Sequence, residues 1–501
     1  MKPNASGLED ESGGEQRTSA SGFDSRYLQG ASAQPPTPLP RLQVFVLCTM
    51  SFAESISIFV IIPFQAQMVE ELGVTSDPSE LGFYLGLLAG MFSFTQFFTI
   101  YFWGALSDRI GRRPVLIIGL CGVIGSTIMF GLSKSFTMVL VSRALSGILN
   151  GNSAIVKSAL GEITDETNRG TAFPYVISCW SLGSLLAPGI GGFLSHPAER
   201  YPFIFGFELL RQYPYLPPCL VGSALSTVGL VIGILFLVET LPRDSVRTGA
   251  ERRSLLVSKP QTYTRFCPAS ALRPDQNSRP TSVKDITRDP YVRKVLVSYG
   301  FMTYITAAIH SLMVLWMYTP VEAGGMGFST AEIGTALLLS GLSGKIITLI
   351  VYPPLERRMG ALYLFRCTMI MKVSIALAFP LGHICAIAGG KKGAYLGVGA
   401  MPVVLCAGGV AYVSNMLLIT HSAPCKRSLG TINGLAQMTA SVSRAVAPVM
   451  ANSLFAFSTK RKILGGNLVW LVLSLVAFLG VVVACQIPSD RPPDAESQRR
   501  D

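Results

Sequence analysis

The chain has 501 residues, of which half are hydrophobic and 14% are charged, and its formal net charge is +12. A soluble globular protein has about 25% charged residues, so the composition excludes an ordinary soluble domain and indicates a membrane protein. The basic residues stand between apolar runs, which favours membrane topology over nucleic-acid binding. The ten cysteines and four histidines show no metal-binding spacing.

Residues 1–40 are rich in Ser, Gly, Pro and charge and contain no apolar core. This composition predicts a disordered tail, not a cleaved signal peptide or a membrane span. The first apolar run that follows is therefore expected to act as an uncleaved insertion signal.

An apolar helix of about 20 residues crosses the hydrocarbon core of a bilayer. Twelve such runs are found, near residues 43–67, 81–103, 114–132, 136–158, 171–194, 218–238, 293–318, 331–353, 363–386, 395–420, 431–457 and 464–487. The sequence therefore predicts an all-α membrane protein with two six-helix bundles, a linker and a short tail. Their predicted bounds are 41–238 and 291–488 for the bundles, 239–290 for the linker and 489–501 for the tail.

The basic residues of the linker and of the turn at Arg109–Arg113 place these segments, and both termini, in the cytoplasm by the positive-inside rule. The first connection, VEELGVTSDPSE, carries only acids and is expected outside. Two basic connections, at Lys391–Lys392 and Lys460–Lys462, fit poorly because they would lie on the outer side.

The two halves show traces of a repeat. GALSDRIGRRP follows the second run and PPLERRMGALY follows the eighth, while Ala187–Pro188 and Ala447–Pro448 occupy corresponding helices. Parallel six-helix repeats are one known construction of membrane transporters.

Asp108 lies in the turn between the second and third runs. The positive-inside rule accounts for the arginines of this turn but not for an acidic residue. Its carboxylate can pair with a neighbouring arginine, or face the positive N-terminal end of a helix from the other half. Either contact would close the cytoplasmic face. The alternative is a solvated turn whose charges serve topology only.

The sequence GALSDRIGRR resembles the signature of the major facilitator superfamily, G-x-L-[AS]-D-R-x-G-R-[RK]. This resemblance implies that the turn is an inner gate closing against the second half. The gating residues would be Gly104, Asp108, Arg109, Gly111, Arg112 and Arg113.

Two further motifs resemble the same family. LVSRALSGILNG contains the fourth-helix pattern R-x-x-x-G-x-x-x-G, which begins at Arg143. GSLLAPGIGG resembles the fifth-helix antiporter pattern but has Ala187 where Gly is usual. Its matching residues are Gly183, Pro188, Gly191 and Gly192. Close packing of small residues is an alternative role for this motif.

Three other segments resemble the drug:proton antiporter branch, near the fungal and zinc-induced-facilitator-like transporters. They are LQVFVLCTMSFAESISIFVIIPF, SHPAERYPF and NGLAQMTASVSRAVAP. The resemblance covers residues 42–488.

Ionisable residues within a bilayer are costly and mark functional sites. Glu54, in the first run, is predicted to bind a proton or a cationic substrate, or else to form a structural ion pair. The family resemblance implies that Arg143, in the fourth run, couples the proton or pins its helix. Its alternative partners are Glu54 or carbonyl groups of the fifth helix.

The predicted substrate-binding residues are Arg444, Asn150, Gln437 and His310. For His310, a satisfied core histidine is the alternative. Lys345 and Lys372 are expected to extend toward the cytoplasmic ends of their helices. The excess of positive charge favours an anionic or zwitterionic solute.

We therefore predict a secondary transporter that exports a small organic molecule, or sequesters it in an organelle, by proton antiport with alternating access. No GxxxxGK[ST] loop is present, so the predicted energy source is the proton gradient, without a cofactor or metal. The predicted partners are the solute, protons and lipid, the protein acts as a monomer, and its location is the plasma or vacuolar membrane. Alternatives are a proton-solute symporter and a transport-dead receptor. An enzyme is not expected, because no nucleophile–base pair is found.

Overall fold

The computed structural model describes residues 37–77, 80–165, 168–240, 287–399, 401–422 and 429–488. The predicted N-terminal tail, most of the predicted linker and the C-terminal tail lie outside these ranges. The compact unit Leu39–Asp501 holds all the helices discussed below. Within the described residues the regular elements are helices, as predicted for an all-α membrane protein.

The first half contains eleven helices of the described chain. They are α1 (Arg41–Phe59), α2 (Gln65–Glu71), α3 (Leu81–Ile110), α4 (Arg112–Gly131), α5 (Phe136–Leu149), α6 (Asn152–Ile163), α7 (Arg169–Leu194), α8 (Pro197–Arg200), α9 (Pro202–Phe205), α10 (Glu208–Gln212) and α11 (Leu216–Phe236), of which α8 and α9 are single turns. The predicted first and fourth runs are each interrupted, at residues 60–64 and at Asn150–Gly151.

The second half begins at α13. Its elements are α13 (Pro290–Tyr318), η5 (Val321–Ala323), α14 (Thr330–Ile350), α15 (Tyr352–Met359), α16 (Ala361–Gly399), α17 (Met401–His421), α18 (Leu429–Arg461), η7 (Ile463–Gly466) and α19 (Leu468–Cys485). The helix α16 contains a sharp break at Gly390, where the backbone is not helical. This break separates the predicted ninth run from the residues that lead into α17.

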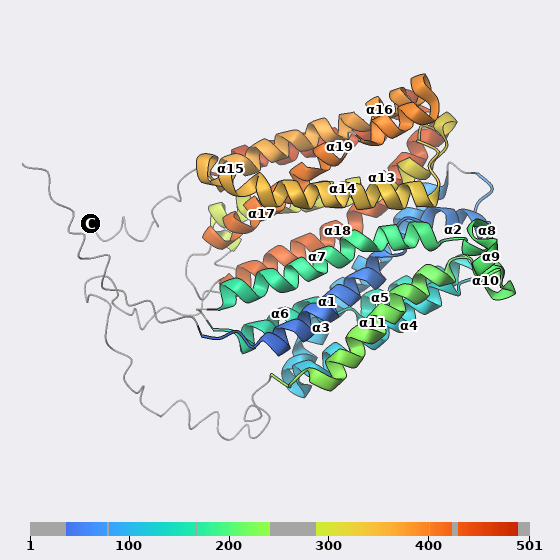
Figure 1. The fold of residues 1–501 in the computed structure, drawn as a ribbon. Helices are drawn as coiled ribbons and strands as arrows, with labels where there is room; N and C mark the ends of the chain where they lie inside the picture. Colours follow the sequence, from blue (N-terminus) through green and yellow to red (C-terminus); the bar gives the residue numbers. More distant parts are fainter. Residues whose placement is uncertain are drawn as a thin grey trace, which may run out of the picture. The chain divides into compact units, whose positions relative to one another are not determined.

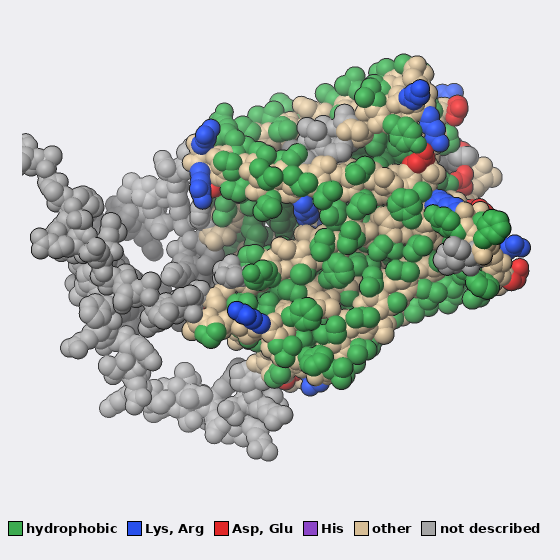
Figure 2. All heavy atoms as spheres, viewed as in Figure 1, with side chains coloured by type: hydrophobic (Ala, Val, Ile, Leu, Met, Phe, Trp, Pro, Cys, Tyr) green, Lys and Arg blue, Asp and Glu red, His purple; other side chains and the backbone are tan. Residues whose placement is uncertain are grey.

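Ten helical segments of the described chain are long and apolar enough to span a membrane. The other two predicted runs, 395–420 and 431–457, fall mainly in α17 and α18. α18 is not among the ten, and its sequence is rich in Ser, Thr and Asn. In Figure 1 the helices of the first half group together below those of the second half. In Figure 2 the visible face is mainly hydrophobic and most charged side chains lie near the two ends of the helices.

The two ends of the helices are named here by a residue at each. The Asp108 end holds the turn between α3 and α4, and the Glu71 end holds the connection between α2 and α3. The two basic connections that fit the predicted topology poorly pair with acids. Lys391 Nζ lies 3.2 Å from Glu332 Oε1, and Lys460 Nζ lies 2.6 Å from Glu80 Oε1. These lysines therefore make structural contacts, which accounts for basic residues on that side.

Candidate functional site

The turn that carries Asp108 is built by a glycine between two helices. α3 ends at Ile110, Gly111 has a φ of +105°, and α4 begins at Arg112. Positive φ strongly favours glycine here. Arg112 Nη1 lies 2.6 Å from Asp108 Oδ1, while the Asp108 side chain is 64% exposed. The sequence allowed two contacts for the Asp108 carboxylate, and this structure contains the ion pair with a neighbouring arginine.

Two acids that the sequence analysis did not identify complete the turn. Arg112 Nη2 lies 3.0 Å from Glu162 Oε1. Glu239 accepts hydrogen bonds from the backbone N–H groups of Arg112, at 2.8 Å, and Arg113, at 3.1 Å. A carboxylate is favourable at this position because the N-terminus of α4 carries partial positive charge. A Cβ atom at Gly111 would collide with the Glu239 carboxylate, which gives a second reason for glycine.

The other predicted gating residues are near the same turn. Gly104 has open space beside it, and Arg109 is exposed. The ion pairs of Arg112, with Asp108 and Glu162, lie within the first half. Closure of this turn against the second half therefore stays a prediction.

Glu54 lies deep inside the first half. Its side chain belongs to α1 and the residue is 1% exposed. Asn150 Nδ2 donates a hydrogen bond of 3.1 Å to Glu54 Oε1, and Gln96 Nε2 donates one of 3.0 Å to Asn150 Oδ1. Asn150 stands at the break between α5 and α6. The predicted solute residue Asn150 is thus joined directly to the predicted proton residue Glu54.

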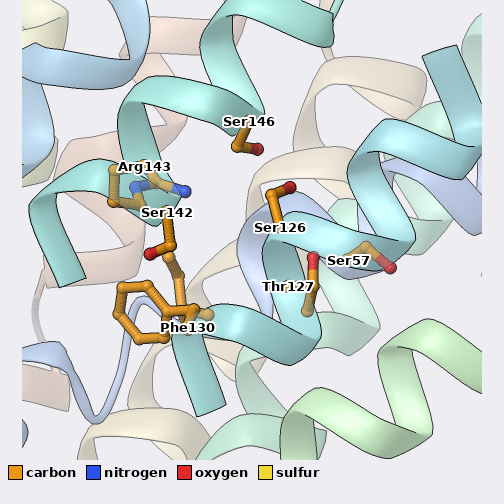
Figure 3. Close-up of a pocket in the computed structure, with 8 residues that line it drawn as sticks. Ser57, Ser126, Thr127, Phe130, Ser142, Arg143 and Ser146 are labelled. Atoms are coloured by element: carbon orange, nitrogen blue, oxygen red, sulfur yellow. The ribbon is translucent and has the colours of Figure 1, made fainter. Parts of the chain in front are cut away.

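Arg143 borders a small polar cavity in the first half. The cavity has a volume of about 10 Å³, which is close to the minimum for one water molecule. Figure 3 shows Arg143 among hydroxyl-bearing side chains. The lining residues are Ser57, Ile61, Ser126, Thr127, Phe130, Ser142, Arg143 and Ser146.

The Arg143 guanidinium has few direct partners. Its carbon Cζ lies 5.1 Å from the centre of the Phe92 ring, a cation–π contact. Among the described residues, Nε has no hydrogen-bond partner, and no ion pair joins Arg143 to Glu54. The alternative in which these two residues pair is therefore not realised in this structure.

The remaining predicted solute residues are in the second half. Arg444, Gln437 and His310 are all exposed side chains. The Arg444 guanidinium donates a hydrogen bond of 3.2 Å to Ser441 Oγ. It also lies within electrostatic range of Lys157, which belongs to α6 of the first half and was missed by the sequence analysis.

Lys345 and Lys372 do not extend to the ends of their helices, so that expectation was wrong. Lys372 is 2% exposed, and its Nζ donates a hydrogen bond of 2.8 Å to Thr306 Oγ1 on α13. Lys345 Nζ donates one of 3.0 Å to Ser181 Oγ, in the middle of α7. Lys372 is about 16 Å from the start of α16, which is farther than a lysine side chain can reach.

The glycines of the fifth-helix motif make close helix contacts. A Cβ atom at Gly183 would lie 2.5 Å from the backbone oxygen of Phe52 on α1. One at Gly192 would lie 2.6 Å from the backbone oxygen of Thr330 on α14. Gly191 approaches the backbone of Val60, and the backbone oxygen of Pro188 lies beside Gly334. The packing role considered for these small residues is therefore present.

The two halves are joined at the Glu71 end. Thr330 Oγ1 lies 2.9 Å from Ser195 Oγ and accepts a hydrogen bond of 2.7 Å from Arg200. Tyr318 donates to the Glu70 carboxylate. Together with the Lys460–Glu80 pair, these contacts close the Glu71 end in this structure.

Comparison with known proteins places this arrangement in a family. The family model described as Major Facilitator Superfamily matches residues 47–448. The chain belongs to the major facilitator superfamily. This result confirms the family predicted from GALSDRIGRR and identifies the chain as a multi-pass membrane transporter of small molecules.

Two fungal relatives align over most of the chain. The major facilitator-type transporter psiT2 of Psilocybe cyanescens is 34% identical, over 89% of this chain and 90% of its own length. The multidrug transporter mfsB of Aspergillus fumigatus is 28% identical, over 90% and 84%. A bacterial homologue of the human lysosomal transporter Spinster shares the fold, with a TM-score of 0.61 and 13% identity over 91% of this chain and all of that one.

Proposed function

We propose that this major facilitator transporter exports a small organic molecule from the cytoplasm, or sequesters it in an organelle, in exchange for protons. The direction of transport is supported by a relative from Aspergillus niger, 28% identical, that is named efflux pump azaK. The coupling ion is proposed from the chemistry of the first half.

The observation that carries proton coupling is the environment of Glu54. A carboxylate buried in a membrane protein is costly unless it is paired or protonated. Among the described residues no cation forms an ion pair with Glu54, and its hydrogen bond comes from the neutral amide of Asn150. An amide can serve both forms of the carboxyl group, because it can donate or accept a hydrogen bond. Glu54 is therefore suited to gain and lose a proton during each cycle.

Alternating access is proposed from the difference between the two ends. The Glu71 end is closed by contacts between the halves, whereas the Asp108 carboxylate is largely exposed. In the other state, the Glu71-end contacts would break and the Asp108 turn would close against the second half. Opposite closures expose the site between the halves to each side in turn.

The test is solute movement in proteoliposomes under an imposed pH gradient. Organic anions, zwitterions, drugs and zinc would be screened with wild type and with Glu54→Gln and Asp108→Asn. Glu208→Gln is the matched control, because Glu208 is an exposed acid on the short helix α10. Solute accumulation opposite to proton flow, lost in Glu54→Gln and retained in Glu208→Gln, is the expected result.

Other outcomes would select the alternatives. Solute accumulation in the same direction as proton flow would identify a symporter. Antiport that survives Glu54→Gln would remove Glu54 as the proton site. Solute binding without movement under any gradient would favour a receptor.

A further inference from the structure

Three basic side chains converge in the second half, from three different helices. They are Lys372 of α16, Lys345 of α14 and His310 of α13. Both ammonium groups lie within electrostatic range of the His310 ring. The described ion pairs include none of the three residues.

Lys372 is the buried member of this group. The residue is 2% exposed, and its ammonium donates a hydrogen bond to the Thr306 hydroxyl. A buried ammonium with a neutral partner is poorly compensated, since removing a charge from water is expensive without an opposite charge nearby. The Lys372 ammonium therefore lacks the negative partner of a structural ion pair, and a bound anion would supply it.

The group opens toward the space between the halves. His310 and Lys345 are exposed although both lie within membrane-spanning helices. Lys345 Nζ contacts Ser181, which belongs to the opposite half. A solute between the halves can therefore reach the side chains that surround Lys372.

The same space contains a second positive pair. Lys157 of the first half and Arg444 of the second are exposed and within electrostatic range of each other, so they repel across the interface. Arg444 is about 22 Å from the start of α18, which is near mid-membrane. The acid identified in the first-half bundle, Glu54, is buried and bonded to Asn150. The interior therefore favours negative charge.

We propose that the transported solute is an organic anion whose carboxylate, phosphate or sulfonate group binds at Lys372, Lys345 and His310. Lys157 and Arg444 attract the anion into the space between the halves. Lysines suit this role because an ammonium binds an oxyanion as a point charge with several donors. This inference rests on the proposed transport function, and it adds the charge of the solute.

The test compares ligands that share one body and differ in charge. The probes are naphthoate, naphthyl phosphate, naphthalenemethanol and naphthylmethylammonium. Binding to the purified full-length protein in neutral detergent is measured by ligand-dependent thermal stabilisation, which does not require transport. Inorganic phosphate and phosphatidylglycerol are separate arms, so that a free anion or a lipid headgroup can be distinguished from an organic solute.

The variants are Lys372→Met and Lys345→Met, with Lys294→Met as the control. Lys294 is a half-buried lysine on α13 that lies outside this group, and its ammonium donates a hydrogen bond to the backbone oxygen of Gln486. Removing the buried charge of Lys372 should not lower thermal stability, and Lys345→Met provides a second variant at an exposed position. We expect an anionic probe to bind at least tenfold more tightly than the alcohol and the ammonium. Each site variant should weaken anion binding about tenfold, while the control does not.

Tighter binding of the ammonium probe, or no binding of either organic anion, would overturn the proposal. So would anion binding that both site variants leave unchanged. If inorganic phosphate alone, or phosphatidylglycerol alone, stabilised the protein as much as the organic anions did, the proposal of an organic solute would also be overturned. Export of a cation in exchange for protons would keep the proposed function and refute this inference. Anion binding that depends on the lysines, without proton-driven movement of the solute, would support this inference and refute the proposed function.

Discussion

Closure of the Glu71 end depends on close contact between α7 and α14, and Gly192→Ala should weaken it. The added Cβ atom would lie 2.6 Å from the Thr330 backbone oxygen and 2.9 Å from the Gly334 Cα atom. Ordinary contact begins at 3.4 Å, so the helices would have to separate by about 0.8 Å. Neither backbone atom can rotate away as a side chain could.

The cost falls on the closed state, because the contact is lost when the end opens. Overpacking of this kind costs about 1–3 kcal/mol, which changes the ratio of open to closed molecules on the order of 5- to 150-fold. The expected result is an increased population that is open at the Glu71 end.

Distances between spin labels can measure this population. Labels at Glu208→Cys and Glu322→Cys would report on the two halves, since both side chains are exposed near the Glu71 end. The exposed Cys121 and Cys485 would first be replaced by serine. Gly192→Ala should increase the population with a longer distance between the labels.

Gly125→Ala is the matched control, because a Cβ atom at this helical glycine meets no atom within 4 Å. A distance distribution that is the same in Gly192→Ala and wild type would refute the reasoning. So would an equal change in Gly125→Ala, since a general loss of helix packing would then explain both.

Two other contacts give independent predictions. The hydrogen bond from Lys460 lowers the pKa of Glu80, so its contribution to closure should be complete above the ordinary carboxylate range and lost as pH falls through the lowered pKa. The long-distance population in wild type should therefore grow as pH falls below the ordinary carboxylate range. A pH-independent distribution, or Lys460→Met retaining the wild-type response, would contradict this. Arg112→Gln should lower the free energy of unfolding by about 2–3 kcal/mol, because Glu162 loses a charged partner. Arg109 is exposed, so Arg109→Gln should have little effect in the same denaturation assay. Equal losses of unfolding free energy in the two variants would contradict this role of Arg112.

The sequence contained enough information to predict the helices and the turn at Asp108. Long apolar runs determine where helices cross a membrane, and the turn is encoded within ten consecutive residues, Gly104–Arg113. The burial of Glu54 was also predictable, because an acid in the middle of an apolar run cannot avoid the bilayer except by facing the protein interior.

The partners of these residues could not be predicted in the same way. Glu162 and Glu239 are 50 and 127 positions from Arg112, and no local pattern shows that they meet it. The break at Asn150 lacks a proline, so the fourth run appeared continuous. Lys372 appeared able to reach a helix end because the sequence does not state which way its side chain faces.

The interruption of the fourth run has a mechanical consequence. α6 is about 18 Å long. Asn150 lies two positions before its first residue, and Glu162 lies in its last turn. Asn150 bonds to Glu54, and Glu162 holds Arg112. A tilt of this rod by about 10° at the break would displace its far end by about 3 Å, enough to separate a hydrogen-bonded pair. A tilt of α6 at the break would therefore change the contact between Glu162 and Arg112 at the Asp108 turn, so α6 physically connects the surroundings of the buried carboxyl group to that turn.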